Sequence, residues 1–175
     1  MSNDKLTFDY NDKDSSSYDL RGNNKFLVVV DDTPECRKAV RYASRRAQGS
    51  GGSLLLLRVV DSRTELAHWI TVEERMKEEA FANAEELLEN IGSEINNLAG
   101  ILPAVAIRSG KLQDEILSQI KADPAISVLV LAAAPGTEGP GPLVTALAGT
   151  LSGEMRIPVT VVPGNLSDEE IDQLA

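Results

Sequence analysis

Five short runs of apolar residues recur along the chain and predict the strands of a parallel β-sheet. Each run is rich in leucine or β-branched residues and is too short for a typical helix, as expected of strands buried on both faces. The predicted strands cover residues 26–30, 54–60, 101–108, 126–132 and 158–162. Proline cannot donate a hydrogen bond to a neighbouring strand, so Pro103 places the third strand at an edge of the sheet.

The segments between these runs show the three- and four-residue spacing of helices. The longest extends from Thr71 to Leu98, with one apolar stripe and with Glu and Asn residues on the opposite face. Thr71 and Glu74 are spaced as a capping box at its start. The stripe consists of Met76, Ala80, Ala84, Leu87, Leu88, Ile91, Ile95 and Leu98. Shorter helices are predicted after the first strand, over residues 113–121 and over residues 143–148.

Strands that alternate with helices indicate an α/β fold, because right-handed crossovers place helices on both faces of a parallel sheet. A chain of 175 residues is expected to form a single such domain. We expect a polar extension over residues 1–24, the domain over residues 25–163 and a short helical tail over residues 164–175. Ser167 and Glu170 are spaced as a capping box in the tail. Whether the tail contacts its own domain or a partner stays open.

The loop after the first strand is expected to carry the functional site. It reads Asp31-Asp32-Thr33-Pro34-Glu35, in which Thr33 can cap the next helix and Pro34 suits its first position. In open α/β sheets, ligands bind just beyond the carboxyl ends of the strands. Asp31 therefore lies where binding or chemistry is expected.

Composition argues against several classes of function. Seventeen Lys and Arg residues against 27 Asp and Glu residues give a net charge of -10, so neither nucleic acid nor an anionic membrane is an expected partner. No apolar run can span a bilayer and no signal peptide pattern is present, so the cytoplasm is the expected location. One histidine and one cysteine provide no spacing for a metal site, and Cys36 is expected in the core.

The predicted first helix carries a basic stripe, formed by Arg37, Arg41 and Arg45. Such a stripe is typical of a solvated helix face. In so acidic a chain it is also suited to an acidic partner surface or to the chain's own tail.

The loop after the fourth strand contains a pattern of glycines. Gly136, Gly139 and the pair Gly149-Thr150 form a G-x-x-G-x9-G-T sequence. Glycines allow the backbone to approach phosphate oxygens, amide groups can then donate to the anion, and a hydroxyl adds another donor. Pro140 and Pro142 act against this interpretation, because each removes one amide donor.

These features together resemble the universal stress protein family. Residues 29–35 are similar to the family's V-D-G-S-E start, residues 56–59 to its L-L-H-V second strand, and residues 158–162 to its closing P-V-L-V-V. The resemblance covers residues 25–163. It implies an adenine-nucleotide alpha-hydrolase-like fold with strand order 3-2-1-4-5. It also implies a stress-response regulator that is not an enzyme, and a homodimer through the fifth strand, from Pro158 to Val162. A slow ATPase is not excluded.

The resemblance assigns ligand contacts to particular residues. In ATP-binding members, the Asp after the first strand contacts adenosine, a Val at the end of the second strand lines the adenine pocket and the glycine motif holds the phosphates. These roles fall on Asp31, Val59, Gly136, Gly139, Gly149 and Thr150. ATP or AMP is thus the implied cofactor, with Mg²⁺ only alongside ATP. Asp32 departs from the family glycine and Arg58 from its histidine.

A gap-free alignment of the same region leads to another reading. It places the family's first two glycines on Ala132 and Pro135 and its Gly-Ser on Thr145-Ala146. The family also includes members without the motif that do not bind ATP. The alternative is therefore a dimeric interaction module that binds no nucleotide.

A phosphoacceptor receiver domain is a further alternative, because Asp31 and Asp32 could bind Mg²⁺ there. It is disfavoured, since the third strand ends without an Asp and no Lys follows the fifth strand.

Overall fold

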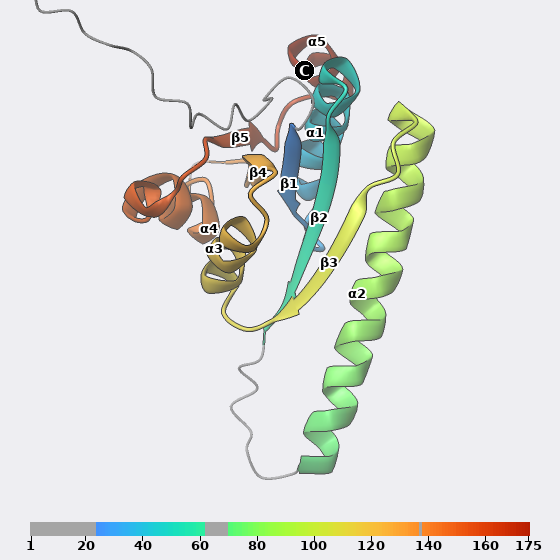
Figure 1. Cartoon of the computed structure of the whole chain (residues 1–175), viewed down its shortest axis with the longest axis vertical. Coiled ribbons are helices and arrows are strands. Elements are labelled where there is room, and N and C mark those ends of the chain that lie inside the picture. The colour runs from blue at the N-terminus through green and yellow to red at the C-terminus, as the bar shows by residue number, and fades with distance from the viewer. Residues whose placement is uncertain (1–23, 62–69, 137) are drawn as a thin grey trace, which may run out of the picture.

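The computed structural model describes residues 24–61, 70–136 and 138–175, and side chains within the long second helix from residue 75 onward. Its centre is a parallel sheet of β1 (Lys25–Val29), β2 (Ser53–Val60), β3 (Ala104–Ser109), β4 (Ile126–Ala133) and β5 (Val159–Pro163). The strand order is β3-β2-β1-β4-β5, which confirms the expected order (Figure 1). The α/β fold class is confirmed as well.

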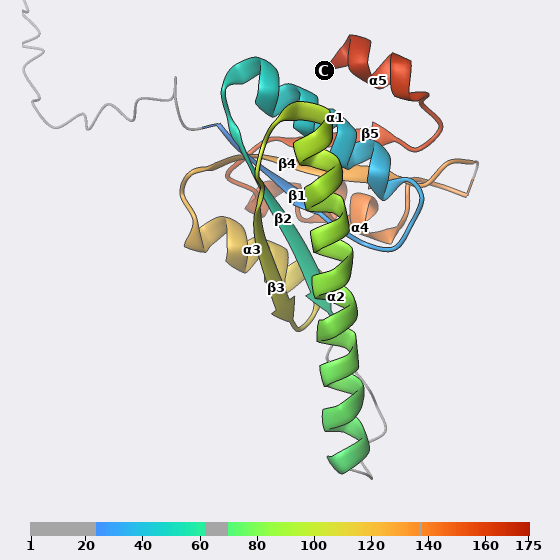
Figure 2. The ribbon, with the colours of Figure 1, turned by 90° about the vertical axis from the view of Figure 1, so that its right-hand side faces the viewer.

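Helices cover both faces of this sheet, as Figure 2 shows. One face packs against α1 (Cys36–Ser50) and α2 (Ile70–Ala99). The other packs against α3 (Leu112–Ala122), α4 (Pro142–Thr145) and the helical turn η1 (Ala146–Thr150), which a short turn, η2 (Ser152–Glu154), follows. Successive residues of β1 alternate between the two cores. Val28 joins the core under α1 and α2, whereas Leu27 and Val29 join the core under α3 and α4.

The prediction for the start of α1 was wrong. The helix begins at Cys36, and the capping residue is Glu35, whose side chain makes no capping hydrogen bond. Thr33 does not cap the helix, because its amide and hydroxyl both donate to Oδ1 of Asp31. Short side chains such as Asp often bond the backbone two residues ahead, and here that local turn replaces the helix cap.

The third strand lies at the sheet edge, as predicted, but its bounds differ. β3 begins at Ala104, so Pro103 precedes the strand and does not interrupt it. Gly100 follows the last residue of α2 and has a positive φ of 68°, a conformation that favours glycine. The three residues after it connect helix to strand without pairing.

The extent of the long helix was predicted correctly, but one residue of the predicted apolar stripe is not buried. Ala84, Leu88, Ile91 and Ile95 are buried, whereas Met76 is 49% exposed. The reason is visible in Figure 2, where the first half of α2 extends past the end of the sheet and has no strand beneath it. The capping box predicted at Thr71 and Glu74 lies outside the described side chains, and the extension over residues 1–23 lies outside the described residues.

The tail forms α5 (Asp168–Leu174), which packs against α1 and confirms the second capping box. Ile171 is fully buried. Asp168 accepts hydrogen bonds from Lys38 at 2.9 Å and Arg41 at 3.2 Å, and Asp172 pairs with both Arg41 and Arg45. The basic stripe therefore binds mainly the chain's own tail, while its first member, Arg37, pairs with Glu94 of α2 at 2.6 Å.

Acid will remove part of the stabilisation that these ion pairs provide. Hydrogen bonds from Arg41 and Arg45 lower the pKa of Asp172 from 3.8 to about 2. Because the pKa is lower in the folded state, the contribution is complete above pH 3.8 and is lost as the pH falls to about 2. Asp172→Asn should flatten the pH dependence of the unfolding free energy across that window, as measured by urea denaturation. Glu169→Gln, an exposed carboxylate on the same helix, should retain the wild-type slope.

Candidate functional site

Asp31 lies two residues beyond the end of β1, at the carboxyl end of the sheet. Its Oδ1 accepts the Thr33 amide at 2.9 Å and also the Thr33 hydroxyl, so the side chain has a fixed orientation. Among the described residues, no donor bonds its other oxygen, Oδ2. One carboxylate oxygen therefore positions the group and the other is available to a ligand.

A cleft of about 310 Å³ opens beside Asp31 between the ends of β1 and β4. Its surface is mainly apolar, and its apolar members come from strands and from the helices on one face of the sheet. They include Val29, Leu112, Leu131, Ala132, Leu143 and Val144. The loop that follows β4 closes the cleft with Pro140, Gly141 and Pro142. An apolar cavity with few polar groups is the usual form of a small-molecule site.

The charge of this cleft is negative. Two carboxylates, Asp31 and Glu35, line it, and no lysine or arginine is among its described lining residues. Cys36 lies at its base, where burial raises the pKa of the thiol to about 11. The thiol is therefore protonated at neutral pH and is a poor nucleophile.

A second cleft, of about 880 Å³, adjoins Asp31 on the side of α2. Val59 lines this cleft together with Asp31, so the structure brings these two predicted residues to one location. Arg58 lies beside them and donates to Oδ2 of Asp32 at 2.6 Å and to the Val30 carbonyl at 3.3 Å. The two departures from the family pattern, Asp32 and Arg58, thus form one ion pair that joins the first loop to β2.

The remaining predicted residues are not brought to Asp31. Gly136 and Gly139 lie in the exposed loop after β4, and Gly149 and Thr150 lie at the exposed end of η1. None of the four is among the described residues that line either cleft. Of the positions favoured by the gap-free alignment, Ala132 lines the first cleft, while Thr145 donates its hydroxyl to the Gly141 carbonyl at 2.9 Å.

Gly141 is a residue that sequence reasoning missed. It stands between two prolines in the wall of the cleft and has a φ of 94°, which favours glycine. The Ala134 amide donates to the Pro140 carbonyl at 3.3 Å and closes the base of this loop. The Pro-Gly-Pro sequence was the available signal, since such clusters mark rigid turns.

Metal binding and membrane spanning find no support in the described part of the chain. There, no group of three or more His, Cys, Asp or Glu side chains is arranged to hold a metal ion. In the same residues, no helix has the length and apolar character needed to cross a membrane.

Known proteins share the sequence features and the fold of this chain. The Universal stress protein family matches residues 22–163. No curated protein sequence matches. Among solved structures, universal stress protein UspA from Lactobacillus plantarum is 23% identical with a TM-score of 0.66, over 81% of this chain and 98% of that one.

Two further structures contain nucleotides. A universal stress protein family protein from Arabidopsis thaliana with AMP bound is 21% identical, with a TM-score of 0.56 over 83% of this chain and 94% of that chain. A universal stress protein in complex with cAMP is 16% identical, with a TM-score of 0.50 over 81% and 98% of the respective chains. At these identities the likeness establishes the fold.

Proposed function

This chain belongs to the universal stress protein family, and we propose that it is a cytoplasmic stress-response regulator that acts by binding an adenine nucleoside or nucleotide. Binding without turnover is consistent with the site. The one cysteine, Cys36, is buried and its pKa is raised to about 11, so its thiol is a poor nucleophile at neutral pH. The AMP and cAMP complexes of structural neighbours support an adenine ligand at the level of the family.

The observation that carries this proposal is the position of Asp31. Its free Oδ2 stands beside an apolar cleft whose volume, about 310 Å³, is near the lower end of small-molecule sites. A purine ring in this cleft would lie against Val29, Leu131 and Leu143. Val59, the residue predicted to line the adenine pocket, would then lie outside the ring's cleft, since it lines the neighbouring one. Asp31 would accept a hydrogen bond from the ligand, either from the 6-amino group or from a ribose hydroxyl.

The charge of the cleft favours ligands with little negative charge. A phosphate group near Asp31 and Glu35 would meet two carboxylates and no lysine or arginine among the described lining residues. Pro140 and Pro142 offer no amide donors to it. Gly136, Gly139, Gly149 and Thr150 remain predicted phosphate ligands, and contacts from them to a ligand in the cleft require another arrangement of the loop after β4. We therefore propose adenosine and AMP as the preferred ligands over ATP.

Calorimetric titration of the full chain with adenosine, AMP and ATP tests this proposal. We expect adenosine to bind most tightly and ATP about tenfold more weakly or worse, because each added phosphate increases the repulsion. Titrations without metal and with Mg²⁺ separate the effect of charge from that of the glycine motif. Tightest binding of ATP with Mg²⁺ would show that the motif forms a phosphate site. No binding of any of the three would favour the interaction module that binds no nucleotide.

We also propose that the chain forms a homodimer through β5. This strand lies at one edge of the sheet, and Val159, Thr160 and Val161 are half-buried and uncharged. An edge of this kind exposes backbone donors and acceptors that a second strand can satisfy.

A further inference from the structure

The opposite edge of the sheet carries a groove of its own. It lies between β3 and the second half of α2 and has a volume of about 630 Å³. Its floor and walls are mostly apolar and include Leu88, Gly92, Leu102, Pro103, Val105 and Ile107. No residue of this groove lines either cleft beside Asp31, although α2 contributes other residues to the larger of those clefts.

The groove exposes apolar surface next to an open strand edge. Leu102 is 82% exposed and Val105 is 56% exposed, and both line it. Among the described residues, β3 pairs only with β2, so its outer backbone groups have no strand partner. Natural proteins usually protect such edges with charges or cover them. The charged residue of this strand, Arg108, does not protect it, because it bonds Gln119 and Glu115 of α3.

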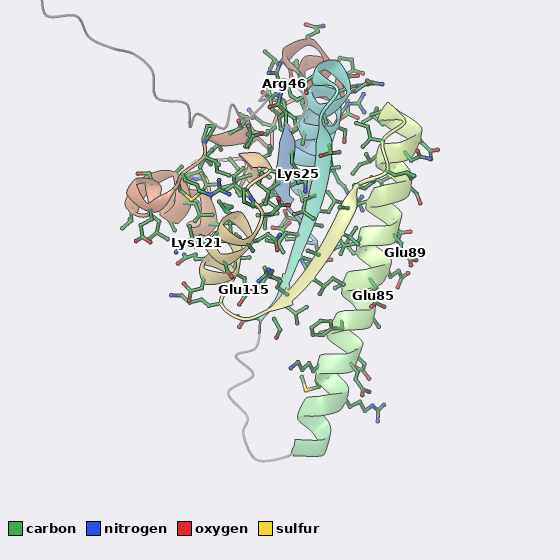
Figure 3. The ribbon with its side chains drawn as sticks, viewed as in Figure 1. Lys25, Arg46, Glu85, Glu89, Glu115 and Lys121 are labelled. Atoms are coloured by element: carbon green, nitrogen blue, oxygen red, sulfur yellow. The ribbon has the colours of Figure 1, made fainter. Side chains whose placement is uncertain are left out.

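The polar part of the groove is acidic. Glu85 and Glu89 stand one helical turn apart on α2 and line the groove, and Figure 3 shows both on the middle of that helix. The other polar lining residues, Ser93 and Asn96, are uncharged, and no lysine or arginine is among the described lining residues. An occupant with positive charges toward α2 and apolar side chains toward Val105 would complement this surface.

We propose that β3 and this groove bind an extended segment of a partner protein whose side chains facing α2, at every second position, include both apolar residues and lysine or arginine. The segment adds a strand to the sheet at β3, a recognised mode of peptide binding. Alternate side chains of a strand point to opposite faces, so every second residue of the segment faces α2. Its apolar and basic residues must share these positions to reach both Val105 and the two glutamates, Glu85 and Glu89. A second copy of this chain fits less well, because a two-fold contact would bring the same glutamates together in a chain of net charge -10. This inference does not depend on nucleotide binding.

The test uses the full chain and a fluorescent peptide of the repeat Val-Thr-Lys-Thr, which places valine and lysine on the same face of a strand. Fluorescence anisotropy should show saturable binding, and Glu89→Lys should weaken it by about tenfold. Glu78→Lys is the matched control, since it makes the same change in net charge at an exposed position of α2 outside the groove. Equal weakening by the two variants would overturn the proposal, because it would indicate general charge attraction.

A second pair of variants tests the apolar contact. Leu102→Ser should weaken peptide binding, whereas Leu174→Ser, which changes another exposed leucine on α5, should not. A peptide with alternate N-methylated residues, which lacks the backbone donors along one edge, should lose binding. Binding that survives N-methylation would refute strand addition. A wild-type dimer that Leu102→Ser dissociates in sedimentation would also overturn the proposal, since the groove would then join two copies of this chain.

Discussion

Asp31→Ala is expected to weaken adenosine binding by about 10- to 100-fold, the effect of removing a hydrogen bond to a charged group. The variant removes the carboxylate that faces the cleft and leaves the apolar surface of Val29 and Leu131 in place. Calorimetry on the variant and wild type measures the change. Asp32→Ala is the matched control, because this neighbouring carboxylate is 72% exposed and pairs with Arg58. It should change adenosine binding little.

Inosine distinguishes the two possible contacts of Asp31. It replaces the 6-amino group of adenosine with an oxygen and leaves the ribose unchanged. If Asp31 accepts from the amino group, inosine will bind wild type at least as weakly as adenosine binds Asp31→Ala, because its carbonyl oxygen would face the carboxylate. If it accepts from the ribose, the two nucleosides will bind wild type equally. Adenosine binding that is unchanged in Asp31→Ala would remove the main support for the proposed site.

Val161→Lys is expected to weaken the proposed β5 dimer by about 100-fold or more, because it places a charge on an uncharged strand at the interface. Sedimentation velocity over a range of concentrations measures the effect. Val105→Lys introduces the same side chain at the opposite edge, on β3, and should leave the dimer intact. Thr160→Pro, which removes a backbone donor from β5, gives an independent check.

Circular dichroism must show that each of these variants is folded. Val161 packs partly against the core under α3 and α4, so its replacement also lowers the stability of the monomer to some degree. Folded variants at β5 that sediment like wild type would show that this strand is not the interface.

The sequence was sufficient to predict the sheet, because the patterns that indicate buried strands are local and strong. Buried strands appear as short apolar runs, and crossovers have a fixed hand, so few arrangements were left. The exposed Met76 shows the limit of periodicity. Spacing places a residue on one face of a helix, but whether a strand lies beneath that face depends on where the sheet ends. Thr33 shows another limit, because a cap competes with local bonds to a neighbouring side chain.

The site was only partly predictable for a related reason. Asp31 could be located because it lies two residues after a strand, so the sheet fixes its position. The glycines in the loop after β4 could not be located in this way. The spacing of glycines gives only the number of residues between them, whereas a phosphate site depends on the directions of the amide groups. In this loop, two prolines restrict the path of the backbone and so those directions. The ion pair between Asp32 and Arg58 joins two elements and was not visible along the sequence.

The attachment of α5 also has a consequence for the biosynthesis of the protein. A chain folds from its N-terminus as the ribosome extends it, so α1 and the central strands can form before α5 emerges. During that interval Lys38, Arg41 and Arg45 lack the aspartates that later pair with them. A nascent chain without α5 therefore presents a basic surface that is paired once α5 packs against α1. The charge of this surface changes only when α5 packs against α1.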